Sequence, residues 1–211
     1  MLRVSEIFFS LQGESTFAGL PCVFVRLAGC NLDCSYCDTL YAREGGETLS
    51  REAIFIRVEE YPCRLVEITG GEPLLQAETP ALAAELADRD WEVLVETNGS
   101  LDISVLDPRV VRVMDLKCPS SGETEKIRWD NLTHLTPRDE VKFVVAGRED
   151  YLWAKGVVEG RLPAGPEVLF SPAAGSIPPA DLAAWILEDG LAVRLQLQLQ
   201  KIIWPGEERG V

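Results

Sequence analysis

Short apolar runs alternate along this chain with segments of helical periodicity, and this alternation predicts its architecture. Runs typical of buried parallel strands occupy residues 22–28, 65–68, 92–96, 110–116, 141–145 and 167–170. Helical spacing is found in residues 50–60, 79–90, 149–159 and 178–190. A third pattern occupies residues 192–199, where Leu alternates with Arg or Gln. This alternation predicts a half-exposed strand. Thr79 and Pro80 predict an N-cap and a first-turn proline for the second helix.

The order of these elements predicts an α/β fold with one functional rim. Strands that alternate with helices, and that end in glycines or polar residues, are typical of a parallel (β/α) barrel. A complete barrel takes about 250 residues, and this chain has 211. We therefore expect a partial barrel of about six parallel strands, built as a single domain over residues 1–211.

Composition narrows the classes of function. A formal charge of −14 argues against a nucleic-acid surface, which needs basic side chains to neutralise phosphates. No stretch reaches the ~20 apolar residues of a membrane span, and residues 1–6 lack the features of a signal sequence. We therefore expect a cytoplasmic protein that acts on a small molecule.

Three of the six cysteines form the most informative pattern. Cys30, Cys34 and Cys37 are spaced C-x3-C-x2-C on a loop that follows a predicted strand. A structural zinc site or a standard iron–sulfur cluster takes four protein ligands, whereas three thiolates leave one iron free to bind a reacting molecule. The alternative is that Cys34 and Cys37 are half of a zinc or redox site. The scattered cysteines, Cys22, Cys63 and Cys118, are expected to be buried small hydrophobes.

Several polar residues are candidates for ligand contacts, each with an ordinary structural alternative. Gln12 and Glu14 flank Gly13, so a turn at the glycine would bring both side chains to one ligand. Arg26 lies inside an apolar strand, so it must reach the sheet's end or be paired, either with a substrate carboxylate or with a structural Asp or Glu. Thr39 offers a hard oxygen of the kind that suits Mg²⁺, although its position alone favours a residue that ends the loop or caps a turn.

Two further features bear on the chemistry. The segment Thr69–Pro73 places two glycines at a strand's carboxyl end, where the backbone approaches a ligand closely. His134 is the only histidine and lies in a polar stretch. We expect it at the surface, and a histidine-based acid–base mechanism is therefore not indicated.

Taken together, the motifs carry a family resemblance that spans nearly the whole chain. They occur in the order Ser10–Ser15, Phe24–Thr39, Thr69–Pro73, Glu96–Gly99 and Lys201–Val211. The cysteine spacing resembles that of the radical S-adenosylmethionine (SAM) superfamily. The full set resembles the 7-carboxy-7-deazaguanine synthases, radical SAM enzymes of the 7-deazapurine (queuosine) pathway.

The resemblance implies a carbon–nitrogen lyase that uses a [4Fe–4S] cluster, SAM and Mg²⁺. An adenosyl radical abstracts hydrogen from C6 of 6-carboxy-5,6,7,8-tetrahydropterin, and the ring contracts. Hydrogen return regenerates SAM, and loss of ammonia gives 7-carboxy-7-deazaguanine. The family also implies a homodimer and a reductant such as a flavodoxin. It implies no separate catalytic side chain.

The resemblance also assigns candidate site residues. The cluster is expected on Cys30, Cys34 and Cys37, and Mg²⁺ on Thr39. Residues 1–21 form a substrate segment, and residues 200–211 close the site. Substrate contacts are expected from Leu11, Gln12, Gly13, Glu14, Arg26, Thr69 and the carboxylate of Val211. SAM contacts are expected from Tyr36, Cys37, Asp38, Gly71, Glu72, Asp115, Leu116, Lys117 and Ser171.

The chain departs from the family pattern in two places, and two other functions compete. Gln200 stands where many relatives have histidine, and the segment Lys117–Pro119 differs from the Ser-Pro-Lys of some relatives.

An activating enzyme that installs a glycyl radical on a partner protein shares the cysteine loop. A non-catalytic metal-binding module is the third interpretation.

Overall fold

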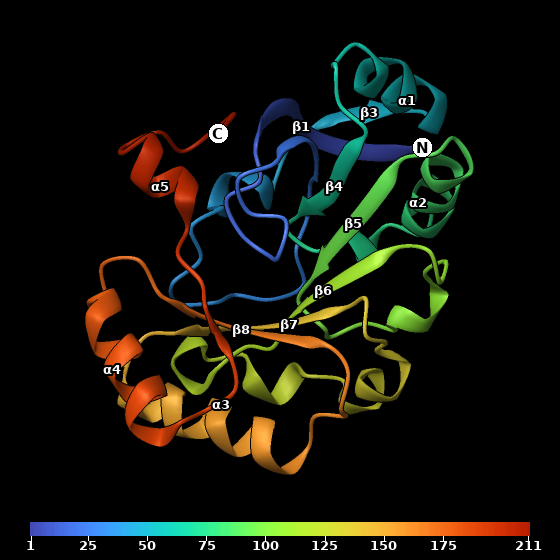
Figure 1. Cartoon of the computed structure of the whole chain (residues 1–211). Helices are drawn as coiled ribbons and strands as arrows, with labels where there is room; N and C mark the ends of the chain where they lie inside the picture. Colours follow the sequence, from blue (N-terminus) through green and yellow to red (C-terminus); the bar gives the residue numbers. More distant parts are fainter.

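One nine-stranded sheet organises the chain, of which a computed structural model describes all 211 residues (Figure 1). Its strands are β1 (Leu2–Leu11), β2 (Pro21–Leu27), β3 (Glu47–Leu49), β4 (Leu65–Gly70), β5 (Glu92–Thr97), β6 (Val111–Asp115), β7 (Glu140–Val145), β8 (Glu167–Pro172) and β9 (Arg194–Leu195). The α-helices are α1 (Arg51–Glu59), α2 (Thr79–Asp88), α3 (Arg148–Gly160), α4 (Pro179–Asp189) and α5 (Leu199–Ile203).

The sheet is an open, mostly parallel array. Its spatial order is β3-β1-β2-β4-β5-β6-β7-β8-β9. Neighbouring strands from β2 to β9 are parallel, whereas β1 runs antiparallel to both β2 and β3. Because β3 and β9 are the two ends of this order and do not pair, the barrel is not closed. The prediction of a partial barrel of about six parallel strands is confirmed, with β9 as a two-residue addition.

The period of two along the strands places alternate side chains on opposite faces of the sheet. In β4, Val66 and Ile68 belong to the core that includes Leu82 and Leu86 of α2. Glu67, between the two apolar residues, lines a cavity on the opposite face. The helices thus cover one face of the sheet, and the other face carries a small apolar cluster that includes Phe24, Leu94 and Val113 together with the polar side chains of the cavity.

A second core repeats this arrangement at the other half of the sheet. Phe143 of β7 and Phe170 of β8 pack edge to face, with ring centroids 5.3 Å apart. Tyr151 of α3 and Leu182 of α4 belong to the same buried cluster. Such aromatic contacts fix α3 and α4 against the strands whose other face bears the cavity.

Four expectations from the sequence need correction. Of residues 192–199, only Arg194 and Leu195 form a strand. The Gln196 N–H still donates to the Phe170 carbonyl of β8 at 2.9 Å, and beyond it the backbone leaves the sheet while the glutamine side chains bind Glu14. The six predicted parallel strands did not include β1, which extends over ten residues at the N-terminal end. Glu78, not Thr79, is the N-cap of α2, and the Thr79 hydroxyl donates to the Pro73 carbonyl at 2.6 Å.

The fourth correction concerns the scattered cysteines. Cys22 and Cys118 are fully buried, as expected. Cys63 is only half-buried, because it lies at the sheet margin, where its thiol donates to the Pro21 carbonyl at 3.0 Å. His134 is exposed, which confirms its predicted surface position. None of the helices combines the length and the apolar character that crossing a membrane requires.

Candidate active site

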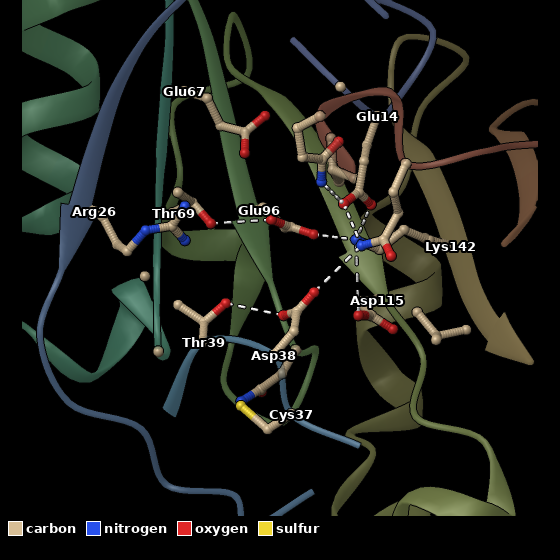
Figure 2. Close-up of a pocket in the computed structure, with 18 of the residues that line it drawn as sticks. Glu14, Arg26, Cys37, Asp38, Thr39, Glu67, Thr69, Glu96, Asp115 and Lys142 are labelled. Atoms are coloured by element: carbon tan, nitrogen blue, oxygen red, sulfur yellow. Dashed lines mark hydrogen bonds and ion pairs between the residues drawn. The ribbon is translucent and has the colours of Figure 1, made fainter. Parts of the chain in front are cut away.

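A cavity of about 400 Å³ opens at the carboxyl ends of the parallel strands. Figure 2 shows acidic and basic side chains from separate strands converging on it. Five carboxylates and five cationic side chains line it: Glu14, Asp38, Glu67, Glu96, Asp115, Arg26, Arg43, Lys117, Lys142 and Lys201. The side chains of the cavity are therefore balanced in formal charge, unlike those of the chain as a whole.

Most of the residues that the sequence singles out meet in this one cavity. Those that line it are Leu11, Gln12, Gly13, Glu14, Arg26, Cys30, Cys34, Tyr36, Cys37, Asp38, Thr39, Thr69, Gly71, Asp115, Lys117 and Val211. Residues separated by up to 200 positions in the chain thus share one surface. The N-terminal and C-terminal segments both contribute to it, as expected from the sequence.

Glu72, Leu116 and Ser171 do not line the cavity. Glu72 is fully buried. Its carboxylate accepts hydrogen bonds from the Asn98 backbone N–H at 2.7 Å and the Thr97 hydroxyl at 2.8 Å. Glu72 therefore ties the turn after β4 to the end of β5. Leu116 and Ser171 are 0% and 1% exposed, respectively, and lie behind the cavity wall.

The cysteine loop lies directly against the glycine turn that follows β4. The Glu72 backbone N–H donates to the Gly29 carbonyl at 2.8 Å. A Cβ atom on Gly71 would lie 2.3 Å from the Gly29 oxygen and 2.8 Å from the Cys30 Cβ. Only a glycine allows this approach, which explains why the Gly-Gly sequence and the first cysteine belong to one site.

The three thiols of the cysteine loop share one cavity. Cys30, Cys34 and Cys37 are free, half-buried and line the same cavity. Thiolates are the protein ligands of iron–sulfur clusters. The chemistry of this donor set therefore suits a cluster that has three protein ligands and one open iron.

Arg26 is paired with protein on one side of its guanidinium and open on the other. Its Nε donates to the Glu6 carboxylate at 2.8 Å, across the β1–β2 pair in which these two residues are opposite each other. Tyr41 also donates to Glu6, at 2.7 Å. The structural alternative is therefore met by Glu6, and Arg26 also lines the cavity.

Lys142 is the centre of a buried network. Its ammonium group donates to Glu14 at 3.0 Å and to Glu96, and Asp115 lies 3.9 Å away (Figure 2). Burial lowers the pKa of Lys142, but the three carboxylates outweigh this and hold the pKa well above its usual value. Lys142 therefore remains charged and compensates the acidic side chains around it.

Asp38 connects the cysteine loop to the C-terminal segment. Its carboxylate accepts hydrogen bonds from Lys201 at 2.5 Å and from the Thr39 hydroxyl at 3.0 Å. Burial raises the pKa of Asp38, but the Lys201 charge and the hydrogen bonds lower it to about 2. Asp38 is thus ionised throughout the physiological range and keeps Lys201 at the cavity rim.

Glu67 lies deep in the cavity wall and has no cationic partner. Its carboxylate accepts a hydrogen bond from the Gln12 side chain. Burial, followed by repulsion from Glu96, raises the pKa of Glu67 to about 8. At neutral pH, Glu67 is therefore largely protonated and neutral.

We predict that Glu67→Gln flattens the pH dependence of stability. Because the folded-state pKa of Glu67 exceeds its usual value, this residue favours folding below pH ~4.5, and that contribution is lost as the pH rises toward 8. Glutamine does not titrate, so the free energy of unfolding of the variant should decline less between pH 5 and 8. Urea denaturation at several pH values measures this.

The control for this prediction is Glu47→Gln, which changes an exposed glutamate. In Glu47→Gln, the free energy of unfolding should decline between pH 5 and 8 as steeply as in the wild type. An equally steep decline in Glu67→Gln and in the wild type would show that Glu67 is ionised in the folded protein at neutral pH.

Sequence reasoning missed several cavity residues, among them Glu67, Lys142 and Gln198, and it named Glu96, Asn98 and Lys201 only as members of longer motifs. One signal was available, because Lys142 interrupts an apolar strand just as Arg26 does. A charged residue in a buried strand must be paired or reach the sheet's end. Applied to every strand, that criterion identifies Glu67 and Lys142 as well.

Comparisons with known proteins agree with this site. Residues 25–115 match the Radical SAM superfamily. The 7-carboxy-7-deazaguanine synthase of Chlorobaculum tepidum is 49% identical, with 100% of this chain and 97% of that protein covered. The enzyme of the same name from Koribacter versatilis is 43% identical, and both chains are covered completely.

A solved structure shows the same fold. The crystal structure of QueE from Escherichia coli superposes with a TM-score of 0.76 at 23% identity, covering 93% of each chain. The identity and coverage of the two curated relatives settle the family. The chain belongs to the 7-carboxy-7-deazaguanine synthase family of the radical SAM superfamily.

Proposed function

We propose that this protein is a lyase that converts 6-carboxy-5,6,7,8-tetrahydropterin to 7-carboxy-7-deazaguanine with loss of ammonia. The observation that carries the proposal is that three cysteine thiols and an arginine with a free guanidinium edge line a single cavity. The relatives that share the chain's full length bear the name of this activity.

The cysteine side of the cavity is the proposed place for the cofactors of the superfamily. Cys30, Cys34 and Cys37 would hold the [4Fe–4S] cluster. With SAM bound to it, the cluster supplies a 5′-deoxyadenosyl radical for hydrogen abstraction. The proposed SAM contacts are the residues that line this side: Tyr36, Asp38, Gly71, Asp115 and Lys117. Asp115 supports this placement, because its Oδ1 is buried and has no hydrogen-bond partner in the protein.

The opposite side of the cavity suits the pterin. Arg26 is the proposed partner of the pterin carboxylate, because its terminal nitrogens donate no hydrogen bond within the protein. Thr69, Gln12 and the Leu11–Gly13 backbone line the wall beside it. Val211 also lines the cavity, and we propose that its carboxylate accepts hydrogen bonds from the N–H groups of the aminopyrimidinone ring.

Thr39 is the proposed protein ligand of Mg²⁺. It lines the cavity between the cysteine loop and Arg26, and its hydroxyl contacts only the neighbouring Asp38. Mg²⁺ takes hard oxygen ligands and commonly combines few protein groups with water and substrate oxygens. One threonine hydroxyl with the oxygens of a bound pterin fits that preference.

The proposal extends to the partners that the family implies. A flavodoxin-like protein would supply the electron, and two copies of the chain would form a homodimer. The activating-enzyme alternative requires a surface for a large protein partner, whereas the charged groups described here converge inside a cavity of about 400 Å³. That enclosure favours a small molecule.

An anaerobic assay tests the proposal. The iron-reconstituted protein is incubated with SAM, dithionite and 6-carboxytetrahydropterin, with or without Mg²⁺, and products are identified by mass spectrometry. We expect 7-carboxy-7-deazaguanine in excess over SAM consumed, at a higher rate with Mg²⁺. Formation of 5′-deoxyadenosine with untouched pterin would overturn the substrate assignment and leave only the superfamily chemistry. A rate that does not depend on Mg²⁺ would remove Thr39 from the proposed site.

A further inference from the structure

The Glu14 carboxylate is unusual among the cavity's acidic groups because protein donors surround it. Oε1 accepts hydrogen bonds from the side-chain amides of Gln198 and Gln200, each at 3.0 Å. Oε2 accepts from Lys142 at 3.0 Å and from the Gln196 amide at 3.1 Å. Three alternate residues of one segment therefore bind the same carboxylate.

These four bonds leave Glu14 without a free acceptor position. An ionised carboxylate offers about four lone-pair sites, and each oxygen of Glu14 already accepts two hydrogen bonds. Burial raises the pKa of Glu14, but Lys142 and the amide donors bring it below its usual value, so the group stays ionised. The sequence-based expectation that Glu14 binds substrate is therefore not what this geometry favours.

Backbone contacts show that the glutamine segment is docked along the whole turn around Glu14. The Leu199 N–H donates to the Gly13 carbonyl at 3.0 Å, and the Ser15 N–H donates to the Gln196 side chain at 2.8 Å. A Cβ atom on Gly13 would lie 1.8 Å from the Gln200 Oε1. Gly13 thus makes room for the glutamine side chain.

The docked segment leads directly to residues at the cavity rim. Lys201 follows Gln200 and pairs with Asp38 at 2.5 Å. Farther on, the Arg209 guanidinium lies 4.2 Å from the centre of the Tyr41 ring. In Figure 1, this red segment runs from the region of α4 to α5 and ends close to the blue N-terminal strand. The position of Glu14 therefore sets the path of the chain toward Val211.

We propose that Glu14 is a positioning residue that fastens residues 196–200 across the cavity through Gln196, Gln198 and Gln200. On this view, Glu14 acts on the substrate through the C-terminal segment and not by direct contact. The link to substrate rests on the proposed function, whereas the fastening itself does not.

A reciprocal exchange tests this proposal. Gln200→Glu places a second carboxylate against Glu14, so repulsion should release the segment. In the double variant Glu14→Gln with Gln200→Glu, the amide donor stands at position 14 and the carboxylate at position 200. One donor again faces one carboxylate, so the segment should be held in place again. In hydrogen exchange of the reconstituted protein, read by mass spectrometry, the peptide covering residues 196–204 should exchange about tenfold faster in Gln200→Glu. The double variant should return toward the wild-type rate.

Two further variants complete the design. Glu96→Gln also removes a carboxylate from Lys142 but touches no glutamine, so exchange of residues 196–204 should not change. Gln198→Leu removes one hydrogen-bond donor to Glu14 without adding a charge, so the exchange rate of residues 196–204 should increase less than in Gln200→Glu. This variant replaces Gln200→Glu in the test if Gln200→Glu does not fold. With active enzyme, the pterin KM should rise in Gln200→Glu and fall again in the double variant.

The proposal is overturned if Gln200→Glu and Gln198→Leu both leave the exchange of residues 196–204 unchanged. It is also overturned if the double variant exchanges as fast as Gln200→Glu, because Glu14 would then not be the fastening group. Neither exchange result depends on pterin turnover. A failure of the proposed function would appear only in the product assay.

Discussion

Cys34→Ala is expected to abolish both the iron–sulfur cluster and the cleavage of SAM. Cys34 lies between Cys30 and Cys37 in the loop, and all three thiols line the cavity. A cluster with three protein thiolates already has one iron without a protein ligand. Loss of Cys34 would leave two such irons and only two protein ligands. Iron content after anaerobic reconstitution should fall from about four atoms per chain to below about one, and 5′-deoxyadenosine should become undetectable.

The matched control is Cys63→Ala. Cys63 is half-buried at the margin of the sheet and does not line the cavity. Its thiol donates only to the backbone, including the Pro21 carbonyl at 3.0 Å. This variant should keep the full iron content and SAM cleavage. A Cys34→Ala protein that retains a complete, SAM-cleaving cluster would contradict the assignment of the three ligands.

Gly71→Ala is expected to destabilise the protein strongly, because the added methyl group would meet backbone atoms of the cysteine loop. The new Cβ would lie 2.3 Å from the Gly29 carbonyl oxygen and 2.7 Å from its carbon. These are backbone atoms, which do not rotate away as the end of a side chain does. The added strain should lower the free energy of unfolding by about 2–4 kcal/mol, as measured by urea denaturation of the iron-free protein.

Gly156→Ala is the control, with the opposite expected sign. Gly156 is exposed within α3, and a Cβ there meets no atom within 4 Å. Alanine favours the helix over glycine by roughly 0.5–1 kcal/mol, so this variant should be slightly more stable than the wild type. Equal stability of Gly71→Ala and the wild type would show that the glycine turn and the cysteine loop can move apart to accommodate a methyl group without loss of stability.

The sequence was most informative where one pattern had one structural solution. Apolar runs separated by helical segments have few alternatives to a parallel sheet covered by helices, and the predicted strands and helices are present. The cysteine spacing and the Gly-Gly turn were likewise predictable, because each has a specific chemical or steric requirement. These features place the site at the carboxyl ends of the strands.

The sequence was less informative where a pattern has two solutions. Leu–Gln alternation over residues 195–200 suits a half-exposed strand, and it equally suits an extended segment whose glutamines bind a distant carboxylate. The choice depends on Glu14, which local periodicity does not reveal. Glu72 shows the same limit, because a buried structural carboxylate and a ligand-binding one look alike in the motif Thr69–Pro73.

The fastening of the C-terminal segment has a consequence for the order of folding. The hydrogen bonds from Gln196, Gln198 and Gln200 to Glu14 span 182 to 186 positions of the chain. Contacts of such long range form after the local strand and helix pairs, since closing a long loop is entropically unfavourable until the rest of the sheet exists. From this entropic argument we expect the sheet and the cysteine loop to form before the glutamines close this side of the cavity.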